Sequence, residues 1–162
     1  MMSVYVGGWG LRTHIAFEQS DSGESSFASG IGAPATVYDS DGNTTSTLTV
    51  TDVVTQWDGY VQSEPPEEGT SYTLFTMEFA NLSDQEITLD PTKFSRFDSF
   101  GRSAAEGRVR TEAVDLINSH LPVGAGDTVV INTVGVILDG TSHMMLMYQP
   151  NHEQTTLLYV GE

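Results

Sequence analysis

The sequence contains no cysteine, and only one of its 162 residues, Lys93, is lysine. Without cysteine the chain has no disulfide, no thiolate metal ligand and no cysteine nucleophile. A small extracellular domain that lacks disulfides depends for its stability on its core, its assembly partners or bound ions.

Basic residues are scarce in general. Six lysines and arginines stand against 22 aspartates and glutamates, which gives a formal net charge of -16. This balance argues against nucleic acid as a partner, because a phosphate backbone is bound by a basic surface. An acidic, lysine-poor and Thr/Ser/Gly-rich composition is typical of proteins adapted to high salt, where a Debye length of about 3 Å at 1 M limits self-repulsion. The alternative is an ordinary acidic surface protein.

Long hydrophobic runs are also lacking. The longest apolar stretches, near residues 136–138 and 144–147, are far shorter than the roughly 20 residues that span a bilayer. We therefore expect no transmembrane segment. Residues 1–10 have no basic start and no apolar core, so we expect no secretory signal in this chain.

The clearest positive pattern is alternation of polar and apolar residues, which is typical of half-buried strands. It predicts strands over 47–53, 72–81, 85–89, 128–138, 143–148 and 155–160, with a hairpin joining the second and third. At 38% hydrophobic residues, the chain has enough apolar side chains for one core. We predict an all-β, immunoglobulin-like antiparallel β-sandwich over residues 35–162, with at most one short helix.

Two segments depart from this pattern. Ala113, Leu116, Ile117 and Leu121 have the i, i+3, i+4, i+8 spacing of a short amphipathic helix that Pro122 ends, with a strand as the alternative. Residues 1–34 are predicted to form an N-terminal arm and linker, since 19–34 is rich in Ser and Gly. Within the arm, 4–6 and 13–17 are candidate short strands.

A series of motifs follows the strand at 47–53. In order, they are Glu-Pro-Pro-Glu-Glu-Gly at 64–69, a strand at 72–80 ending in Asn-Leu-Ser-Asp-Gln-Glu, Leu-Asp-Pro-Thr-Lys-Phe at 89–94, Phe-Asp-Ser-Phe-Gly-Arg at 97–102, and Leu-Pro-Val-Gly-Ala-Gly-Asp at 121–127. This order resembles a family of immunoglobulin-like domains of unknown function, common on secreted proteins and lipoproteins of bacteria and archaea. The resemblance covers about 115 of the 162 residues. It implies the fold and a surface role, and it brings no catalytic residues. Members generally have a signal peptide and often a lipid-anchored cysteine, and this chain has neither.

The acidic segment at 39–43 has two interpretations. Asp39, Asp41 and Asn43 offer oxygens at the spacing with which a Ca²⁺ loop begins, but the glycine is misplaced and position twelve is Val50. Asp41-Gly42 between two strand patterns is also a strong hairpin signal. We favour the turn, with a weak Ca²⁺ site as the alternative and no other cofactor.

Two sequons and four histidines complete the polar candidates. Asn43 and Asn81 begin Asn-x-Ser/Thr triplets in predicted turns, so they are weak glycosylation candidates. His14, His120, His143 and His152 lack the close pairing that presets zinc ligands, so we interpret them as surface histidines.

The most informative feature is where the basic residues lie. Five of the six occur within 18 positions: Lys93, Arg96, Arg102, Arg108 and Arg110. Phenylalanine occurs at every third residue of the same segment, at Phe94, Phe97 and Phe100. One interpretation is that the phenylalanines anchor the segment to the core while the basic groups pair with local carboxylates. The other is a basic patch that docks onto another subunit, either a second copy or an acidic partner.

We do not expect an enzyme. The sequence has no Gly-x-Ser-x-Gly elbow and no phosphate-binding glycine loop, and Glu67-Glu68 beside two prolines is typical of an exposed loop. The first hypothesis is a decoration or assembly subunit of an extracellular particle, such as a virion capsid or tail or a surface filament. The alternative is an exported cell-surface or secreted ligand-binding domain, and a hydrolase is a distant third.

Overall fold

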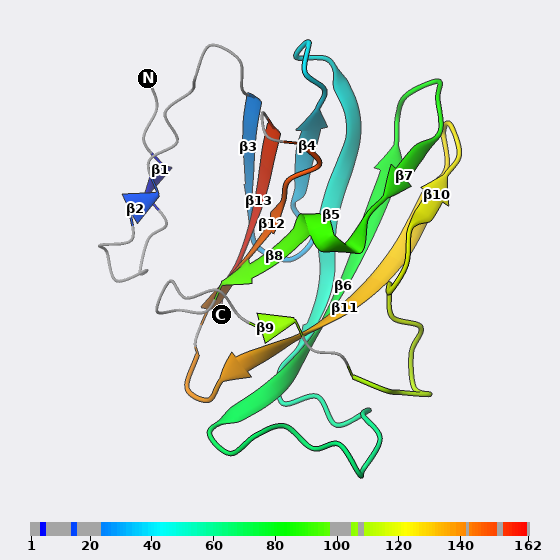
Figure 1. Ribbon diagram of the computed structural model, residues 1–162. Helices are drawn as coiled ribbons and strands as arrows, with labels where there is room; N and C mark the ends of the chain where they lie inside the picture. The colour runs from blue at the N-terminus through cyan, green and yellow to red at the C-terminus, as the bar shows by residue number, and fades with distance from the viewer. Residues whose placement is uncertain are drawn as a thin grey trace.

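The computed structural model describes most of the chain between its N-terminal region and its last residue. The described residues are 4–5, 14–15, 24–97, 105–106, 109–141, 143–151 and 154–161. They form two facing β-sheets with short satellite strands (Figure 1). The prediction of an all-β, immunoglobulin-like sandwich is confirmed.

One layer is a five-stranded antiparallel sheet. Its order is β4 (Pro34–Tyr38), β5 (Thr44–Val54), β6 (Thr70–Asn81), β11 (Thr128–Leu138) and β9 (Ala105–Glu106). The three longest strands are those in which β-branched and aromatic residues alternate with polar ones, a pattern that suits a pleated surface with one buried face. The central pair, β6 and β11, is in register from Thr128↔Ala80 to Leu138↔Thr70.

The other layer is a four-stranded sheet. Its order is β3 (Glu24–Ser29), β13 (Gln154–Gly161), β12 (His143–Tyr148) and β8 (Phe94–Phe97). The pairs β12–β13 and β12–β8 are antiparallel, as an immunoglobulin-like sandwich predicts. The edge strand β3 instead runs parallel to β13.

The remaining elements are short. Strands β7 (Ile87–Leu89) and β10 (Leu121–Val123) pair with each other, and so do β1 (Val4–Tyr5) and β2 (His14–Ile15). A single 3-10 turn, η1 (Pro91–Lys93), begins at Asp90, whose carboxylate accepts a hydrogen bond from the Thr92 N–H. The two short N-terminal strands confirm the strand candidates in the arm, and no helix longer than η1 occurs among the described residues.

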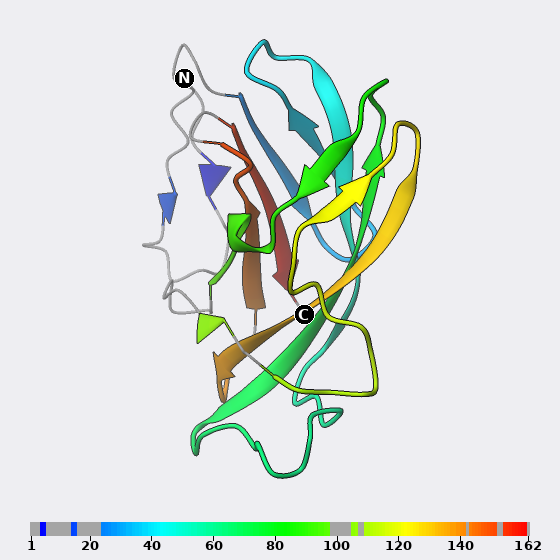
Figure 2. The same ribbon diagram turned by 45° about the vertical axis from the view of Figure 1, so that its right-hand side comes forward.

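The core lies between the two layers (Figure 2). Phe75, Met77 and Phe79 of β6 are fully buried and face the four-stranded sheet. Tyr148 of β12 stacks on Phe94 at 4.7 Å between ring centroids and meets the edge of Phe79 at 6.2 Å. Burial raises the pKa of Tyr148 to about 12. Each such side chain contributes about 1.5–3 kcal/mol by leaving water, so these few residues dominate the cohesion between the sheets.

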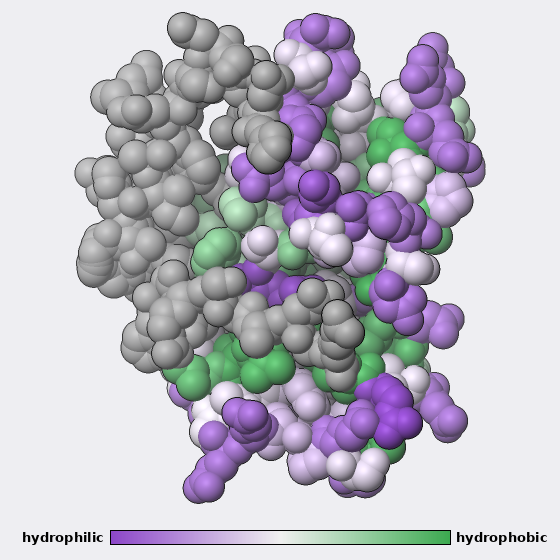
Figure 3. Space-filling model, in the orientation of Figure 1, coloured by the Kyte–Doolittle hydropathy of each residue, from purple (hydrophilic) through white to green (hydrophobic). Residues whose placement is uncertain are grey.

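The surface has many hydrophilic side chains, as the net charge of -16 leads us to expect. Figure 3 shows strongly hydrophilic side chains at both tips of the sandwich, at the top and the bottom of the view. Loops join the strands there, and most carboxylates of these loops face water. The main cluster of buried apolar side chains lies between the sheets.

Three predictions about local structure are wrong. The helix over 113–121 does not form: residues 112–120 are bends and irregular backbone, and their apolar side chains are divided between two clusters. Val114 and Leu116 pack near Trp57, and Ile117 packs against the main core. The hairpin of 72–81 with 85–89 is also wrong, since β7 pairs with β10 and not with β6.

The third correction concerns the boundary of the arm. Residues 24–29, expected as loop or linker before residue 35, form β3 and belong to the four-stranded sheet. An edge strand needs main-chain partners more than large apolar side chains, and β3 buries Ala28 while Phe27 is 38% exposed. The high Ser and Gly content of this segment therefore led to the prediction of a loop where a strand of the sandwich forms.

A buried arginine joins the two layers. Arg96 of β8 is 5% exposed, and its guanidinium donates to Thr133 Oγ1 on β11 of the opposite sheet. Gly135 makes room for it, because a Cβ at that position would lie 2.8 Å from Arg96 Cδ and 3.5 Å from the Phe75 ring.

We predict that Gly135→Ala destabilises the fold by about 1–3 kcal/mol, since the added methyl would lie 2.8 Å from Arg96 Cδ and forces this side chain to move in a packed interior. Chemical denaturation monitored by tryptophan fluorescence measures the loss. Val130→Ala on the same strand, at a side chain 61% exposed, is the control and should change stability by less than about 0.5 kcal/mol. Equal effects of the two substitutions would contradict the close approach of Arg96 to β11.

Candidate functional site

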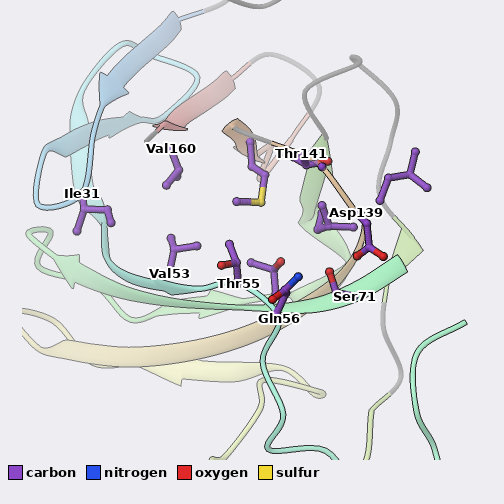
Figure 4. Close-up of a pocket in the computed structure, with 13 residues that line it drawn as sticks. Ile31, Val53, Thr55, Gln56, Ser71, Asp139, Thr141 and Val160 are labelled. Atoms are coloured by element: carbon purple, nitrogen blue, oxygen red, sulfur yellow. The ribbon is translucent and has the colours of Figure 1, made fainter. Parts of the chain in front are cut away.

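A pocket of about 290 Å³ opens between the sheets at one end of the sandwich. It lies where β5 ends and β6 begins, beside the β3–β4 loop and the β11–β12 turn (Figure 4). Five separate stretches of the chain contribute side chains to it. We call it the loop-end pocket.

One wall of the loop-end pocket is apolar. Val160 and Met144 are 4% and 5% exposed and belong to the core, and Val53 packs against that core. Ile31 stands at the mouth with 53% of its surface exposed. It is flanked by Gly30 and Gly32, whose φ angles of 95° and 86° favour glycine.

The opposite wall is polar. In Figure 4, Asp139 and Thr141 lie on one side of the pocket, with Gln56 and Ser71 next to them, across from Ile31 and Val160. The Thr141 hydroxyl oxygen is buried and hydrogen-bonds no atom of the described residues. A buried hydroxyl without a partner costs about 1–3 kcal/mol, which a ligand or a water molecule offsets by bonding to it.

The polar wall is held by main-chain hydrogen bonds. The Asp139 N–H donates to the Gly69 carbonyl at 3.0 Å, and the Thr141 N–H donates to the Leu138 carbonyl at 3.2 Å. Gln56 has a φ of 49°, and it is the non-glycine residue with positive φ among those that the structure describes. Such a conformation in a residue that lines a pocket is a frequent mark of functional sites.

The sequence alone does not reveal this pocket. The Asp139-Gly140 pair between two strand patterns was a visible turn signal, and Ile31 between two glycines was a visible exposed apolar residue. Neither signal shows that the two lie on opposite walls of one cavity. That proximity depends on the packing of the two sheets.

The structure separates the five basic residues that the sequence grouped as a docking patch. Lys93 is exposed, whereas Arg96 is buried between the sheets. Arg102 and Arg108 lie outside the described residues. The prediction that Arg96 contacts a partner is wrong, because Arg96 shares the buried inner face of β8 with Phe94, two residues earlier.

Arg110 pairs with a carboxylate of the same chain. Its Nη2 and Nε lie 2.8 and 3.0 Å from Glu64 Oε1, and this hydrogen bond lowers the pKa of Glu64. Nearby, the Thr111 hydroxyl donates to the Gly59 carbonyl at 2.5 Å, and the Val61 N–H donates to the Arg110 carbonyl. Arg110 therefore pairs with a carboxylate of its own chain, but with one that lies 46 residues earlier in the sequence.

These hydrogen bonds join residues 59–64 to residues 110–111, so they hold two loops over the outer face of the five-stranded sheet. Trp57, Leu74 and Val134 are buried there, with Tyr60 edge-on to Tyr72 at 5.1 Å between ring centroids. The loop after β5 and the segment from 109 to 116 thus cover a second, smaller apolar cluster. Arg110 stabilises this cover.

The acidic segment at 39–43 is the hairpin turn between β4 and β5. Asp39 Oδ1 accepts the N–H groups of Asp41 and Asn43, each at 2.9 Å, and Gly42 has a φ of 82°. The hydrogen bond from the Asn43 N–H, followed by that from Asp41, lowers the pKa of Asp39. The turn interpretation is confirmed. Among the described residues no group of three or more His, Asp or Glu side chains could hold a metal ion.

Asn81 is a structural residue. It is 1% exposed, and its Nδ2 donates to the carbonyls of Gln85, Val123 and Gly124 at 2.7, 3.0 and 3.1 Å. Its Oδ1 accepts from the Ser83 N–H and hydroxyl. Its glycosylation candidacy is wrong, because the amide nitrogen that would bear a glycan is buried and fully engaged. Asn43 is exposed and stays a prediction.

The histidines are dispersed. His120 is exposed, with its Nε2 3.5 Å from Asp90 Oδ2. Hydrogen bonds from Thr92 lower the pKa of Asp90 more than His120 does. His143 begins β12, His14 lies in β2, and His152 falls outside the described residues.

Comparison with known proteins shows the fold alone. No family model and no curated protein matches the sequence. Among solved structures, the YjhA protein of Bacillus subtilis superposes with a TM-score of 0.57 at 14% identity, covering 82% of this chain and 98% of YjhA. The predicted lipoprotein YcdA of Bacillus subtilis gives a TM-score of 0.58 at 11% identity over 72% of this chain. The match spans 36% of YcdA.

The described part of the chain includes no helix with the length and hydropathy that crossing a bilayer requires.

We predict that Arg110→Ala raises the pKa of Glu64 toward its ordinary value, as measured by NMR titration of the carboxyl group. Because that pKa is lowered in the folded protein, the pair stabilises the fold above the ordinary glutamate pKa, and the contribution disappears as pH falls through the lowered value. Lys93→Ala is the control and should leave the Glu64 titration unchanged. An unchanged titration in Arg110→Ala would contradict the pairing.

A second prediction concerns Asn81. Its replacement by Ala leaves several buried carbonyls without a donor and should destabilise the fold by roughly 2–4 kcal/mol. Asn43→Ala, in an exposed turn, is the matched control and should lose less than about 1 kcal/mol. Urea denaturation measures both, and equal losses would contradict the structural role of Asn81.

Proposed function

We propose that this chain is a non-catalytic binding module that works outside the cell, on a cell surface or as a secreted domain. The observation that supports it most is the loop-end pocket, which has an apolar wall, a polar wall and a buried hydroxyl without a partner. Pockets of this construction are typical of binding sites for small molecules or for single side chains of a partner. Binding at the loops of an immunoglobulin-like sandwich is also a common use of this fold.

The proposed location rests on two kinds of similarity. The motif order from residue 45 resembles immunoglobulin-like domains of secreted proteins and lipoproteins, and the YcdA neighbour is itself a predicted lipoprotein. The net charge of -16 suits a protein that meets a salt-rich medium. We include adaptation to high salt in the proposal on that ground.

The assembly hypothesis has less support than it had from the sequence. The cluster of basic residues is one of the features that favour a decoration subunit of a virion or filament, and that cluster loses Arg96 to the core and has Arg110 paired with Glu64. Of its described members, Lys93 is an exposed cation that forms no salt bridge with the described residues. The geometry therefore supports binding at the loop end better than docking through the basic segment.

We predict that a library of small fragments, screened by two-dimensional NMR on labelled protein, shifts the amides that line the loop-end pocket. Thr55→Trp places an indole at its rim, where Thr55 is exposed, and should abolish these shifts. Thr88→Trp on the exposed face of β7 is the matched control and should leave them intact.

Two results would count against the proposal. Fragments that shift only residues of the 93–110 segment would move the site to the basic cluster. A defined oligomer by light scattering in high salt, with no fragment in the pocket, would favour the assembly subunit.

A further inference from the structure

The loop-end pocket has two chemically different halves, and this division limits what it binds. Figure 4 shows Ile31, Val53 and Val160 on one side and Asp139, Ser71 and Gln56 on the other. Resting on the proposed function, we propose that the ligand is a small aliphatic primary amine bound in its protonated form. The alkyl part occupies the apolar wall, and the ammonium group faces Asp139 and the hydroxyls.

The apolar half favours a short, branched alkyl group. The pocket volume of about 290 Å³ equals that of roughly ten water molecules at about 30 Å³ each, which is enough for a small alkyl amine. Its apolar side chains are branched or, in Met144, flexible, and most of them belong to the core or pack against it: Val53, Ile137, Met144 and Val160. Each methylene buried against them contributes about 0.8 kcal/mol, so even a small alkyl group binds measurably.

The polar half offers oxygen atoms that accept hydrogen bonds. Asp139 contributes a carboxylate, Thr141 a buried hydroxyl without a partner, and Ser71 a further hydroxyl. A primary ammonium has three N–H donors and no acceptor, so a group of carboxylate and hydroxyl oxygens complements it. Hydrogen bonds between an ammonium and a carboxylate are among the stronger ones in proteins.

The same composition argues against other charged ligands. None of the described residues that line the pocket is basic, and the chain as a whole has a charge of -16, so a carboxylate or phosphate ligand would be repelled. None of those residues is aromatic either. Quaternary ammonium groups are bound by aromatic cages, and this pocket has none among its described lining residues.

Three probes with the same branched five-carbon skeleton test the inference: isopentylamine, isopentyl alcohol and isovalerate, which are cationic, neutral and anionic at neutral pH. Dissociation constants are measured by NMR titration of the Ser71, Thr73 and Gly140 amides at moderate salt. We expect isopentylamine to bind about tenfold more tightly than the alcohol, as a charge-assisted hydrogen bond predicts. Isovalerate should bind most weakly.

Two variants with the same change in net charge separate a specific contact from general attraction to an acidic protein. Asp139→Asn should weaken isopentylamine at least fivefold and leave the alcohol unchanged. Asp84→Asn, in the exposed turn after β6, should leave both unchanged. An NMR fingerprint like that of the wild type shows that each variant is folded. Because the Asp139 main-chain hydrogen bond to Gly69 does not involve its side chain, we expect the fold to survive.

The outcomes distinguish this inference from the proposed function. Equal affinity for amine and alcohol, equal effects of the two variants, or tightest binding of isovalerate would overturn the ammonium assignment and leave a binding pocket in place. If none of the three probes shifts the pocket amides while other fragments do, the ligand class is wrong. If no fragment of any kind binds there, the proposed function fails with it.

Discussion

The antiparallel register between β6 and β11 is the constraint on which the rest of the structure depends. It pairs Ile131 with Met77 and Thr133 with Phe75, and it puts Phe75, Met77 and Phe79 on the inner face. Side chains alternate along a strand, so a slip of one residue would turn these three toward water and Glu78 toward the core. Main-chain bonds at both ends fix the register, from Asn81 to Asp127 and from Asp139 to Gly69.

The two ends of this pair have different roles. At one end, Asn81 ties together the turns that follow β6 and precede β11, and nearly all of its hydrogen-bonding capacity serves the fold. At the other end the sheets are not closed by side chains, and the loop-end pocket lies between them. Asp139 begins the turn that closes β11, so the register that defines the core also places the polar wall of the candidate site.

Arg96 shows why charge clustering along the sequence misled the prediction of a docking surface. Lys93, Arg96 and Arg110 are close in sequence, but they lie in different local structures: Lys93 in η1, Arg96 on the inner face of β8, and Arg110 in the irregular segment before β10. Arg96 points between the sheets and donates to Thr133, with Gly135 leaving space for it, while Arg110 bonds to Glu64, 46 residues earlier. The sequence contained no signal for either partner, since Thr133 and Glu64 are far along the chain.

The sequence by itself determined the strands, because alternation in segments such as 72–81 and 128–138 reflects burial of one face and needs no knowledge of partners. It also determined the hairpin at Asp39, whose turn residues bond to their own neighbours. Tertiary structure alone decided that β3 joins β13, that Asn81 is buried, and that Ile31 and Asp139 line one pocket. These contacts join residues tens to more than a hundred positions apart, and their energies depend on how two sheets pack, which local patterns do not encode.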